Sequence, residues 1–317
     1  IAQQAYLKAD DTDPGDEFGD AIAIDGNTVV VGALWDDSSA TGVNGDATDN
    51  NALNSGAAFV FVREGGVWRR QAYLKASNTG AGDEFGESVA IDEDTIVIGA
   101  AAEDSHSTGV GGNEANDSAP NAGAAYVFVR DGSTWTQQAY LKANNTDAGD
   151  NFGECVSVSG DTIVVGADLE SSAAAGVNGN AADNSAGTAG AAYVFTRSDG
   201  TWTQQAYLKA SNAGEGDQFG ESVAIDGDTA VVGAFLEDSA ATGVEGNGGD
   251  NSATWAGAAY VFIRNGLVWS DQAYLKASNA GAGDGFGLPV AIDGDTVAVG
   301  APGEDGASTG VNGNQLD

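Results

Sequence analysis

The sequence has very little cysteine, histidine and methionine, and each shortage excludes a class of structure. Cys155 is the only cysteine, so no intramolecular disulfide framework and no cysteine-based zinc site can form; it takes the repeat position of Ser88 and Ser222. His106 is the only histidine, and nothing around it marks a Ser-His-Asp triad. We therefore expect no enzyme activity. Methionine is absent even at position 1, which predicts a processed chain or a fragment of a longer one.

Positive charge is also scarce. The 317 residues hold 11 Lys and Arg against 47 Asp and Glu, for a formal net charge of −36. Such a chain repels phosphates, which excludes a general nucleic-acid binder. No apolar run approaches the roughly 20 residues that a membrane-spanning helix needs, so we expect no membrane insertion. Hydrophobic residues make up 42%, enough for a core, and 48 glycines against 4 prolines favour tight turns between short strands.

What the sequence does have is a repeat with a period of 67 residues and no insertion or deletion. The segment Y-L-K-A starts at Tyr6, Tyr73, Tyr140, Tyr207 and Tyr274. The pair F-G starts at Phe18, Phe85, Phe152, Phe219 and Phe286, and a later pair G-A at Gly32, Gly99, Gly166, Gly233 and Gly300. We interpret residues 1–317 as a single array, with units of approximately 1–67, 68–134, 135–201, 202–268 and an incomplete 269–317.

Each unit contains four segments with the alternation of β-strands. One such set of four covers residues 85–91, 95–100, 123–130 and 137–143. Helical periodicity is absent, so the sequence predicts an all-β fold, a β-propeller of four-stranded antiparallel blades. The segment G-A-A-[YF]-V-F occurs only four times, so the last blade lacks one strand. We expect either further repeats in the natural chain or a strand supplied by another molecule.

The order of F-G, V-A-[IL], V-V-G-A and G-A-A-Y-V-F resembles the FG-GAP repeat of integrin alpha-subunit propellers and of secreted bacterial proteins. The resemblance implies an extracellular adhesion or ligand-binding propeller, often calcium-loaded, whose partner is a protein or glycan at the cell surface. In that family the calcium loop joins the first two strands of a blade. Here this connection is only Asp25-Gly26-Asn27 or its equivalent, too short to surround a cation with six or more oxygens.

A calcium site is instead predicted in the long loops between the second and third strands, which are rich in Asp, Asn and Gly. Acidic residues recur at the head of these loops at Asp36, Glu103, Glu170, Glu237 and Glu304, with Asp238 following Glu237. They recur near the loop ends at Asp49, Asp117, Asp183, Asp250 and Asp317. The alternative is a solvated turn in which Asp and Asn bond their own backbone.

Three further sets of residues share one repeat position each. The acids two residues before F-G, which we expect to fix a turn rather than bind an ion, are Asp16, Asp83, Asp150, Asp217 and Asp284. The cations that we expect to pair with carboxylates or cover aromatic rings are Lys8, Lys75, Lys142, Lys209 and Lys276, with Arg63, Arg130, Arg197 and Arg264. Only Arg69 and Arg70 remain outside these positions.

Two groups of tryptophans suggest different roles. The set Trp68, Trp135, Trp202 and Trp269 recurs once per unit, as packing residues do, although a lectin would use such rings to stack on sugars. Trp35 and Trp255 break the repeat and lie in the long loops, where we expect an interface. The leading hypothesis is a non-catalytic extracellular adhesion or ligand-binding propeller. The alternatives are a carbohydrate-binding lectin and a structural subunit that binds copies of itself by strand complementation.

Overall fold

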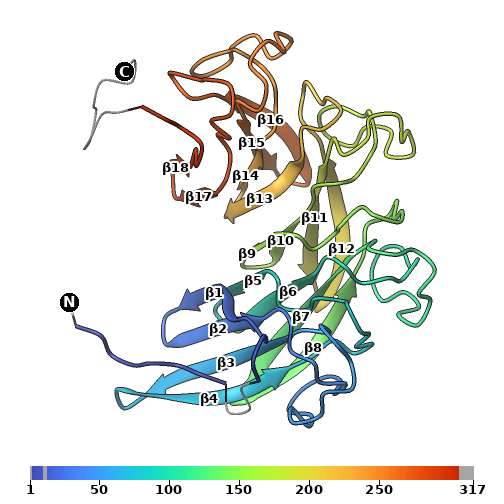
Figure 1. The fold of residues 1–317 in the computed structure, drawn as a ribbon, viewed down its shortest axis with the longest axis vertical. Coiled ribbons are helices and arrows are strands. Elements are labelled where there is room, and N and C mark those ends of the chain that lie inside the picture. Colours follow the sequence, from blue (N-terminus) through green and yellow to red (C-terminus); the bar gives the residue numbers. More distant parts are fainter. Residues whose placement is uncertain (1, 10–12, 307–317) are drawn as a thin grey trace. The chain divides into compact units, whose positions relative to one another are not determined.

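The computed structural model of the chain describes residues 2–9 and 13–306, which form strands, turns and loops without a helix. The strands make four four-stranded antiparallel sheets and one two-stranded sheet, each built from consecutive strands of the chain (Figure 1). The all-β prediction and the repeat are therefore confirmed. Within this described part, no helix is long and apolar enough to cross a membrane.

The chain divides into two compact units, residues 1–165 with 195–204 and residues 166–194 with 205–317. The first unit contains two complete sheets, β1 (Phe18–Asp25), β2 (Thr28–Ala33), β3 (Ala57–Glu64) and β4 (Val67–Leu74), then β5 (Val89–Asp92), β6 (Thr95–Ala100), β7 (Ala124–Asp131) and β8 (Thr134–Leu141). The strands of the third sheet are divided between the units: β9 (Val156–Ser159), β10 (Thr162–Ala167), β11 (Ala191–Ser198) and β12 (Thr201–Leu208).

The second unit contains the fourth and fifth sheets. The fourth consists of β13 (Phe219–Asp226), β14 (Thr229–Ala234), β15 (Ala258–Asn265) and β16 (Val268–Leu275). The fifth consists of β17 (Val290–Asp293) and β18 (Thr296–Val299). In each four-stranded sheet the strands lie in chain order, so β4, β8, β12 and β16 are outer strands.

Two-residue turns join the first two strands of every sheet, as the sequence predicts. Asp25 pairs with Thr28 and Asp92 with Thr95, which leaves Gly26-Asn27 and Glu93-Asp94 as the turns. A connection this short matches the twist of antiparallel strands. It also leaves no room for a cation-binding loop at this point.

Two predictions about the strands are wrong. Residues 6–9, the first Y-L-K-A copy, lie outside any strand. In later copies this segment pairs with the strand before it, as Tyr73 pairs with Phe59. The strand expected over residues 85–91 begins only at Val89, whereas the equivalent strands β1 and β13 begin at Phe18 and Phe219. The last sheet is incomplete as predicted, with two strands among the described residues.

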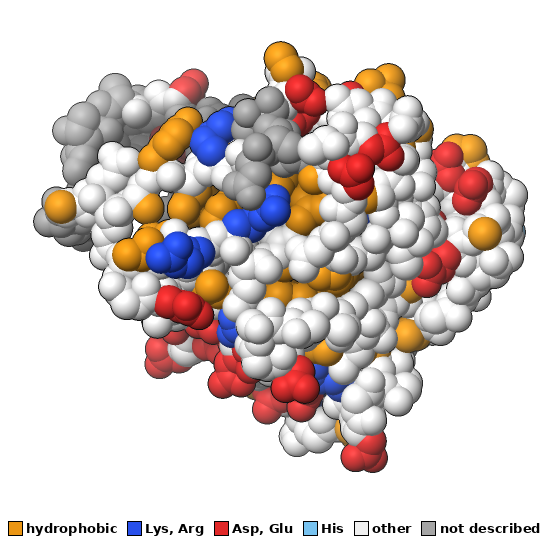
Figure 2. All heavy atoms as spheres, turned by 90° about the horizontal axis from the view of Figure 1, so that it is seen from below, with side chains coloured by type: hydrophobic (Ala, Val, Ile, Leu, Met, Phe, Trp, Pro, Cys, Tyr) orange, Lys and Arg blue, Asp and Glu red, His pale blue; other side chains and the backbone are white. Residues whose placement is uncertain are grey.

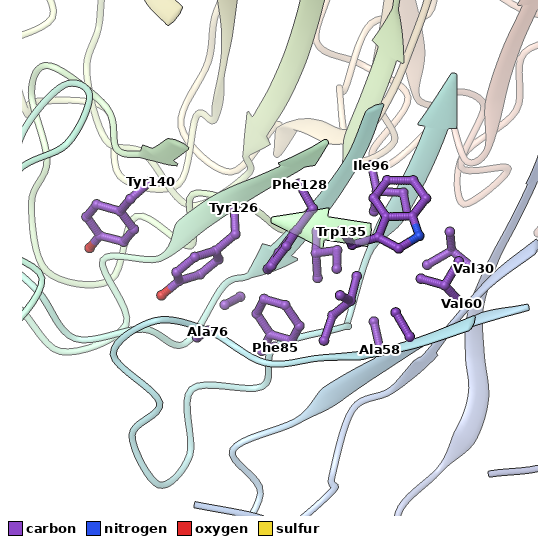
Figure 3. Packing of buried hydrophobic residues seen from close by; sticks show 14 of the residues in the cluster. Val30, Ala58, Val60, Ala76, Phe85, Ile96, Tyr126, Phe128, Trp135 and Tyr140 are labelled. Carbon is purple, nitrogen blue, oxygen red and sulfur yellow. The ribbon is translucent and has the colours of Figure 1, made fainter. Parts of the chain in front are cut away.

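The core lies between successive sheets. In the first unit Phe85, Tyr126 and Phe128 from the second repeat pack against Val30 and Val60 of the first sheet, and all five are buried (Figure 3). Burial of one such side chain contributes roughly 1.5–3 kcal/mol. In the first unit, the facing sides of the first and second sheets therefore share one buried layer.

The three glycine motifs of the repeat meet at this contact. A Cβ at Gly56 would lie 2.1 Å from the carbonyl oxygen of Phe85, and a Cβ at Gly32 would lie 2.0 Å from that of Gly86. The same arrangement places Gly99 against Gly153. The F-G turn of one repeat thus rests directly on the backbone of the preceding one, and only glycine permits that approach.

Candidate functional site

The acid at the head of each of the first four long loops faces a buried lysine. The Nζ of Lys142 lies 2.9 Å from Oε2 of Glu103, and both side chains are almost fully buried. The lysine comes from the Y-L-K-A segment, and the acid lies 39 residues before it in the chain. The equivalent pairs are Lys75–Asp36 at 3.3 Å, Lys209–Glu170 at 2.9 Å and Lys276–Glu237 at 2.7 Å.

Neighbouring groups occupy the remaining positions around this carboxylate. Oε1 of Glu103 accepts hydrogen bonds from the Tyr140 hydroxyl at 2.9 Å and from the Asn78 amide at 2.9 Å. Oε2 accepts the backbone N–H of Ser105 at 3.1 Å in addition to Lys142. Burial lowers the pKa of Lys142, which the charge of Glu103 opposes, and burial raises the pKa of Tyr140. The carboxylate is thus paired and hydrogen-bonded, as a buried charge requires.

The remaining acids predicted to bind calcium lie apart from this pair. Asp238 holds the loop, since its Oδ1 accepts the backbone N–H of Trp255 at 2.8 Å. Asp49 accepts the N–H of Asn51 at 3.0 Å and the hydroxyl of Ser39. Three others lie exposed toward the loop ends, namely Asp117, Asp183 and Asp250. Asp317 lies outside the described residues.

The head carboxylates of the first four loops do not offer the free oxygens that Ca²⁺ needs, because each of these four faces an ammonium group. Glu304, at the head of the fifth loop, lies exposed and accepts a hydrogen bond from Asn279. Among residues 2–9 and 13–306 no group of three or more His, Cys, Asp or Glu side chains is arranged to hold a metal. Calcium binding by the long loops stays a prediction.

If these loops bind calcium, we expect a chelator to lower the thermal midpoint of unfolding and added Ca²⁺ to restore it, since a ligand of the native state raises stability. An unchanged midpoint in differential scanning calorimetry would contradict it.

The acids two residues before each F-G pair fix a turn, which confirms that interpretation. Oδ2 of Asp83 accepts the N–H of Gly80 at 2.7 Å, and Oδ2 of Asp217 accepts that of Gly214 at 2.7 Å. Burial is the largest cause that raises the pKa of Asp83 from 3.8 to about 7 and that of Asp217 to about 6. The hydrogen bonds from glycine oppose this shift, and Glu103 adds to it at Asp83.

These raised values predict how stability depends on pH. Between about pH 4 and pH 7 the folded state holds more protons at Asp83 than the unfolded chain, so this contribution to the free energy of unfolding falls as pH rises. Asp83→Asn keeps an oxygen for the Gly80 N–H and removes the charge. At pH 8 we expect this variant to be about 2 kcal/mol more stable than the wild type, with no gain near pH 4. Urea unfolding at both pH values measures it, and an equal gain at both would contradict the prediction.

The once-per-repeat tryptophans pack between repeats. The Trp135 side chain is 2% exposed, its indole N–H donates to Oε1 of Gln71 at 2.8 Å, and the Arg130 guanidinium lies 5.0 Å from the ring centre. Arg130 also forms an ion pair with Asp94 at 2.6 Å. Trp202 and Trp269 are buried in the same way. These three rings are not accessible for stacking on a sugar, whereas Trp68 is half-buried. The repeated cations have the structural roles expected of them.

The two tryptophans of the long loops are exposed. Trp35 is 38% exposed and Trp255 is 56% exposed. Trp255 has a φ of 59°, in the left-handed region, at a repeat position that Asn54 and Asn121 occupy with φ of 53°. Two hydrogen bonds hold this backbone, from Trp255 N–H to Asp238 and from Gly285 N–H to the Trp255 carbonyl at 3.0 Å. A bulky residue with this conformation is strained, and Asn adopts it more readily.

Sequence reasoning located the acids and lysines but not their pairing, because 39 residues separate the partners and the chain has 47 acids to choose from. The equal repeat spacing of both sets was the available signal. His106 lies exposed in its loop rather than in a deep pocket, and Cys155 is half-buried.

Comparison with known families gives one match. The model of a family described as FG-GAP repeat matches residues 1–61, 68–128, 135–195, 202–262 and 269–315, nearly the whole chain. A search of curated proteins finds no similar sequence.

Proposed function

The chain belongs to the FG-GAP repeat family, and from that premise we propose that it is a non-catalytic ligand-binding or adhesion module that acts outside the cell. Repeats of this family suggest propeller-type domains generally involved in ligand binding, and they usually occur in extracellular or surface proteins. The proposed partner is a protein or a glycan at a cell surface. The proposed contact residues are Trp35 and Trp255, each on the long loop of its own repeat.

The strain at Trp255 carries this proposal. The equivalent residues Asn54, Asn121 and Thr188 have φ between 51° and 53°, and two of the three are the residue type that tolerates it best. The fourth repeat instead places the largest side chain at this point and exposes more than half of it. Strained residues that persist are concentrated at binding sites, and exposed tryptophan is a frequent anchor of interfaces.

Trp255→Asn is therefore expected to raise the free energy of unfolding by about 1 kcal/mol, because Asn relieves the cost of the left-handed conformation. Asn is the residue that the first and second repeats have at this position, so it is compatible with the backbone conformation of the loop. Trp255→Ala serves as the control, since it removes the ring without the preference of Asn for this conformation. Urea unfolding measures both variants, and a loss of stability in Trp255→Asn would show that the ring supports the fold.

A second candidate function, self-assembly, is favoured by a separate observation. In the described part of the chain β18 pairs with β17 alone, so one edge of β18 is open to another strand. A strand from a second molecule at this edge would indicate the structural subunit. The lectin alternative has no comparable support, because three of its four candidate rings are buried.

A further inference from the structure

Each unit contains a contact between two successive sheets that uses the same repeat positions. In the first unit Val89 and Ile91 of β5 pack against the core that contains Val30 of the first sheet. In the second unit Val290 and Ile292 of β17 pack together with residues of the fourth sheet. The first strand of a sheet therefore presents two apolar side chains, two residues apart, to the sheet before it.

The first sheet exposes these two positions. Ile22 and Ile24 of β1 are 66% and 64% exposed, whereas Val290 is 7% exposed. Another part of the same face is covered, because Leu7 and Ala9 pack against the cluster that contains the aromatic rings of β3. Two large apolar side chains exposed side by side on a strand indicate an interaction surface.

Arg63, at the end of β3, adds a positive charge to this sheet. The equivalent arginines of the next three repeats each lie 2.6 Å from an aspartate of their own two-residue turn. In the first repeat the turn has Asn27, whose amide oxygen accepts hydrogen bonds from Nη2 and Nε of Arg63 at 2.6 and 2.9 Å. No carboxylate among the described residues pairs with Arg63. We call the surface of Ile22, Ile24 and Arg63 the head face.

The space-filling view agrees with this mixture of apolar and basic groups. On the side seen from below Figure 1, toward which β4 lies, hydrophobic side chains are exposed in the middle with Lys and Arg among them (Figure 2). Asp and Glu lie toward the margins of this view. In a chain of net charge −36, such a surface favours a partner that brings carboxylates of its own.

The fifth sheet exposes a surface of complementary kind. Ala291 pairs with Ala298 and Asp293 with Thr296, so these four side chains share one face of the hairpin, and all four are exposed. Ala298 takes the repeat position of Val30, which contributes to the core between the first and second sheets. We call this surface of small apolar and acidic residues the tail face.

Polar bonds between successive sheets have their counterparts on the two faces. In the first unit Oδ2 of Asp25 accepts the N–H of Glu93 at 2.9 Å, and Oγ1 of Thr28 accepts a hydrogen bond from Nη1 of Arg130 at 3.1 Å. The tail face has Asp and Thr at the repeat positions of these two acceptors. The head face has Arg63 at the position of the guanidinium donor. Acceptors and donor therefore match across the two faces.

We propose that the head face of one molecule binds the tail face of a second copy of this chain and repeats the contact between successive sheets. In this contact Ile22 and Ile24 lie against Ala291 and Ala298, and Arg63 lies at the acidic turn. Each molecule has one face of each kind, so the contact is head-to-tail and continues from copy to copy. This inference does not rest on the proposed ligand-binding function, and its surfaces differ from the open edge of β18.

A second copy is favoured over an unrelated acidic partner as the occupant of the head face. An unrelated partner would share only the attraction to Arg63. The tail face instead has apolar and polar groups at the spacing that the contact between the first two sheets already uses. Matching of both kinds at one surface is typical of a specific interface.

Two variants block one face each. Ile22→Glu with Ile24→Glu places carboxylates on the head face, and Ala291→Glu with Ala298→Glu places them on the tail face, where burial without a partner is costly. At about 0.15 M NaCl, where a Debye length of about 8 Å screens the repulsion between acidic molecules, analytical ultracentrifugation of the wild type is expected to show a mass that rises beyond a dimer. Each variant alone is expected to associate at least about tenfold more weakly. An equal mixture of both retains one intact face of each kind and is expected to form a dimer that does not grow.

Three controls accompany these variants. Leu267→Glu adds a carboxylate at a residue that is 81% exposed and outside both faces, and it is expected to leave association unchanged. Ile22→Thr with Ile24→Thr repeats the test of the head face without added charge and keeps residues that favour strands. Circular dichroism melts verify that every variant folds.

Four results would overturn the proposal. A wild type that stays monomeric at all concentrations contradicts self-association. Association that survives in the head variant places the contact elsewhere, for example at the open edge of β18. A mixture that fails to dimerise contradicts the head-to-tail pairing. Association lost equally in Leu267→Glu shows that added negative charge alone is responsible.

Discussion

Replacing Lys142 by methionine is expected to lower the free energy of unfolding by about 3–5 kcal/mol, because it leaves the Glu103 carboxylate buried without its cation. Both side chains are almost fully buried, so water cannot take the place of the ammonium group. Methionine keeps most of the volume, which limits any cavity. Urea denaturation followed by tryptophan fluorescence measures the change.

Two controls separate the ion pair from the repeat position. Lys8→Met changes the same position in the first copy, where the lysine is exposed, and is expected to alter stability by less than about 0.5 kcal/mol. Lys142→Met combined with Glu103→Gln removes both charges and is expected to recover a large part of the loss. A single variant as stable as the wild type would show that the pair contributes nothing to the fold.

Gly99→Ala is expected to be severely damaging, with a cost above about 4 kcal/mol. A Cβ at this position would lie 1.9 Å from the carbonyl oxygen of Gly153 and 2.3 Å from Oγ of Ser88. The obstacle is backbone from the next repeat, which cannot rotate away as a side chain can. Relief requires that two successive repeats separate, so the buried contact between them weakens.

Gly187→Ala is the matched control, since its Cβ would meet only Oε1 of Glu215 at 3.9 Å. We expect a change within about 0.5 kcal/mol. Thermal unfolding of both variants gives the comparison. If Gly99→Ala melted at the wild-type temperature, the close approach between repeats would not exist in solution.

The period of 67 residues predicted most of the fold, because strand alternation, turns and glycine motifs recur together. The Asp25–Thr28 hairpin and the turn at Asp83 are local, within a few residues of chain, and both were predictable. The late start of the strand predicted from Phe85 was not, because the equivalent F-G pairs at Phe18 and Phe219 do lie in strands.

The candidate site was less predictable for a similar reason. The pairing of Lys142 with Glu103 joins residues 39 apart, and acidity alone favoured a calcium ligand as strongly as a lysine partner. The different residue type at Trp255 was visible in the sequence. Its strain was not, because it depends on a positive φ that only the structure gives.

The most direct test of the proposed function compares ligand binding by the wild type with that of Trp35→Ala combined with Trp255→Asn. Both replacements are residues that sister repeats carry at these positions, so the fold is expected to be kept. The measurement is binding of labelled protein to an array of extracellular matrix proteins and purified glycans at about 0.15 M salt. We predict that at least one probe binds the wild type and that the variant loses at least about tenfold in affinity. Equal binding by both proteins, or no binding to any probe, would contradict a ligand-binding role for these loops.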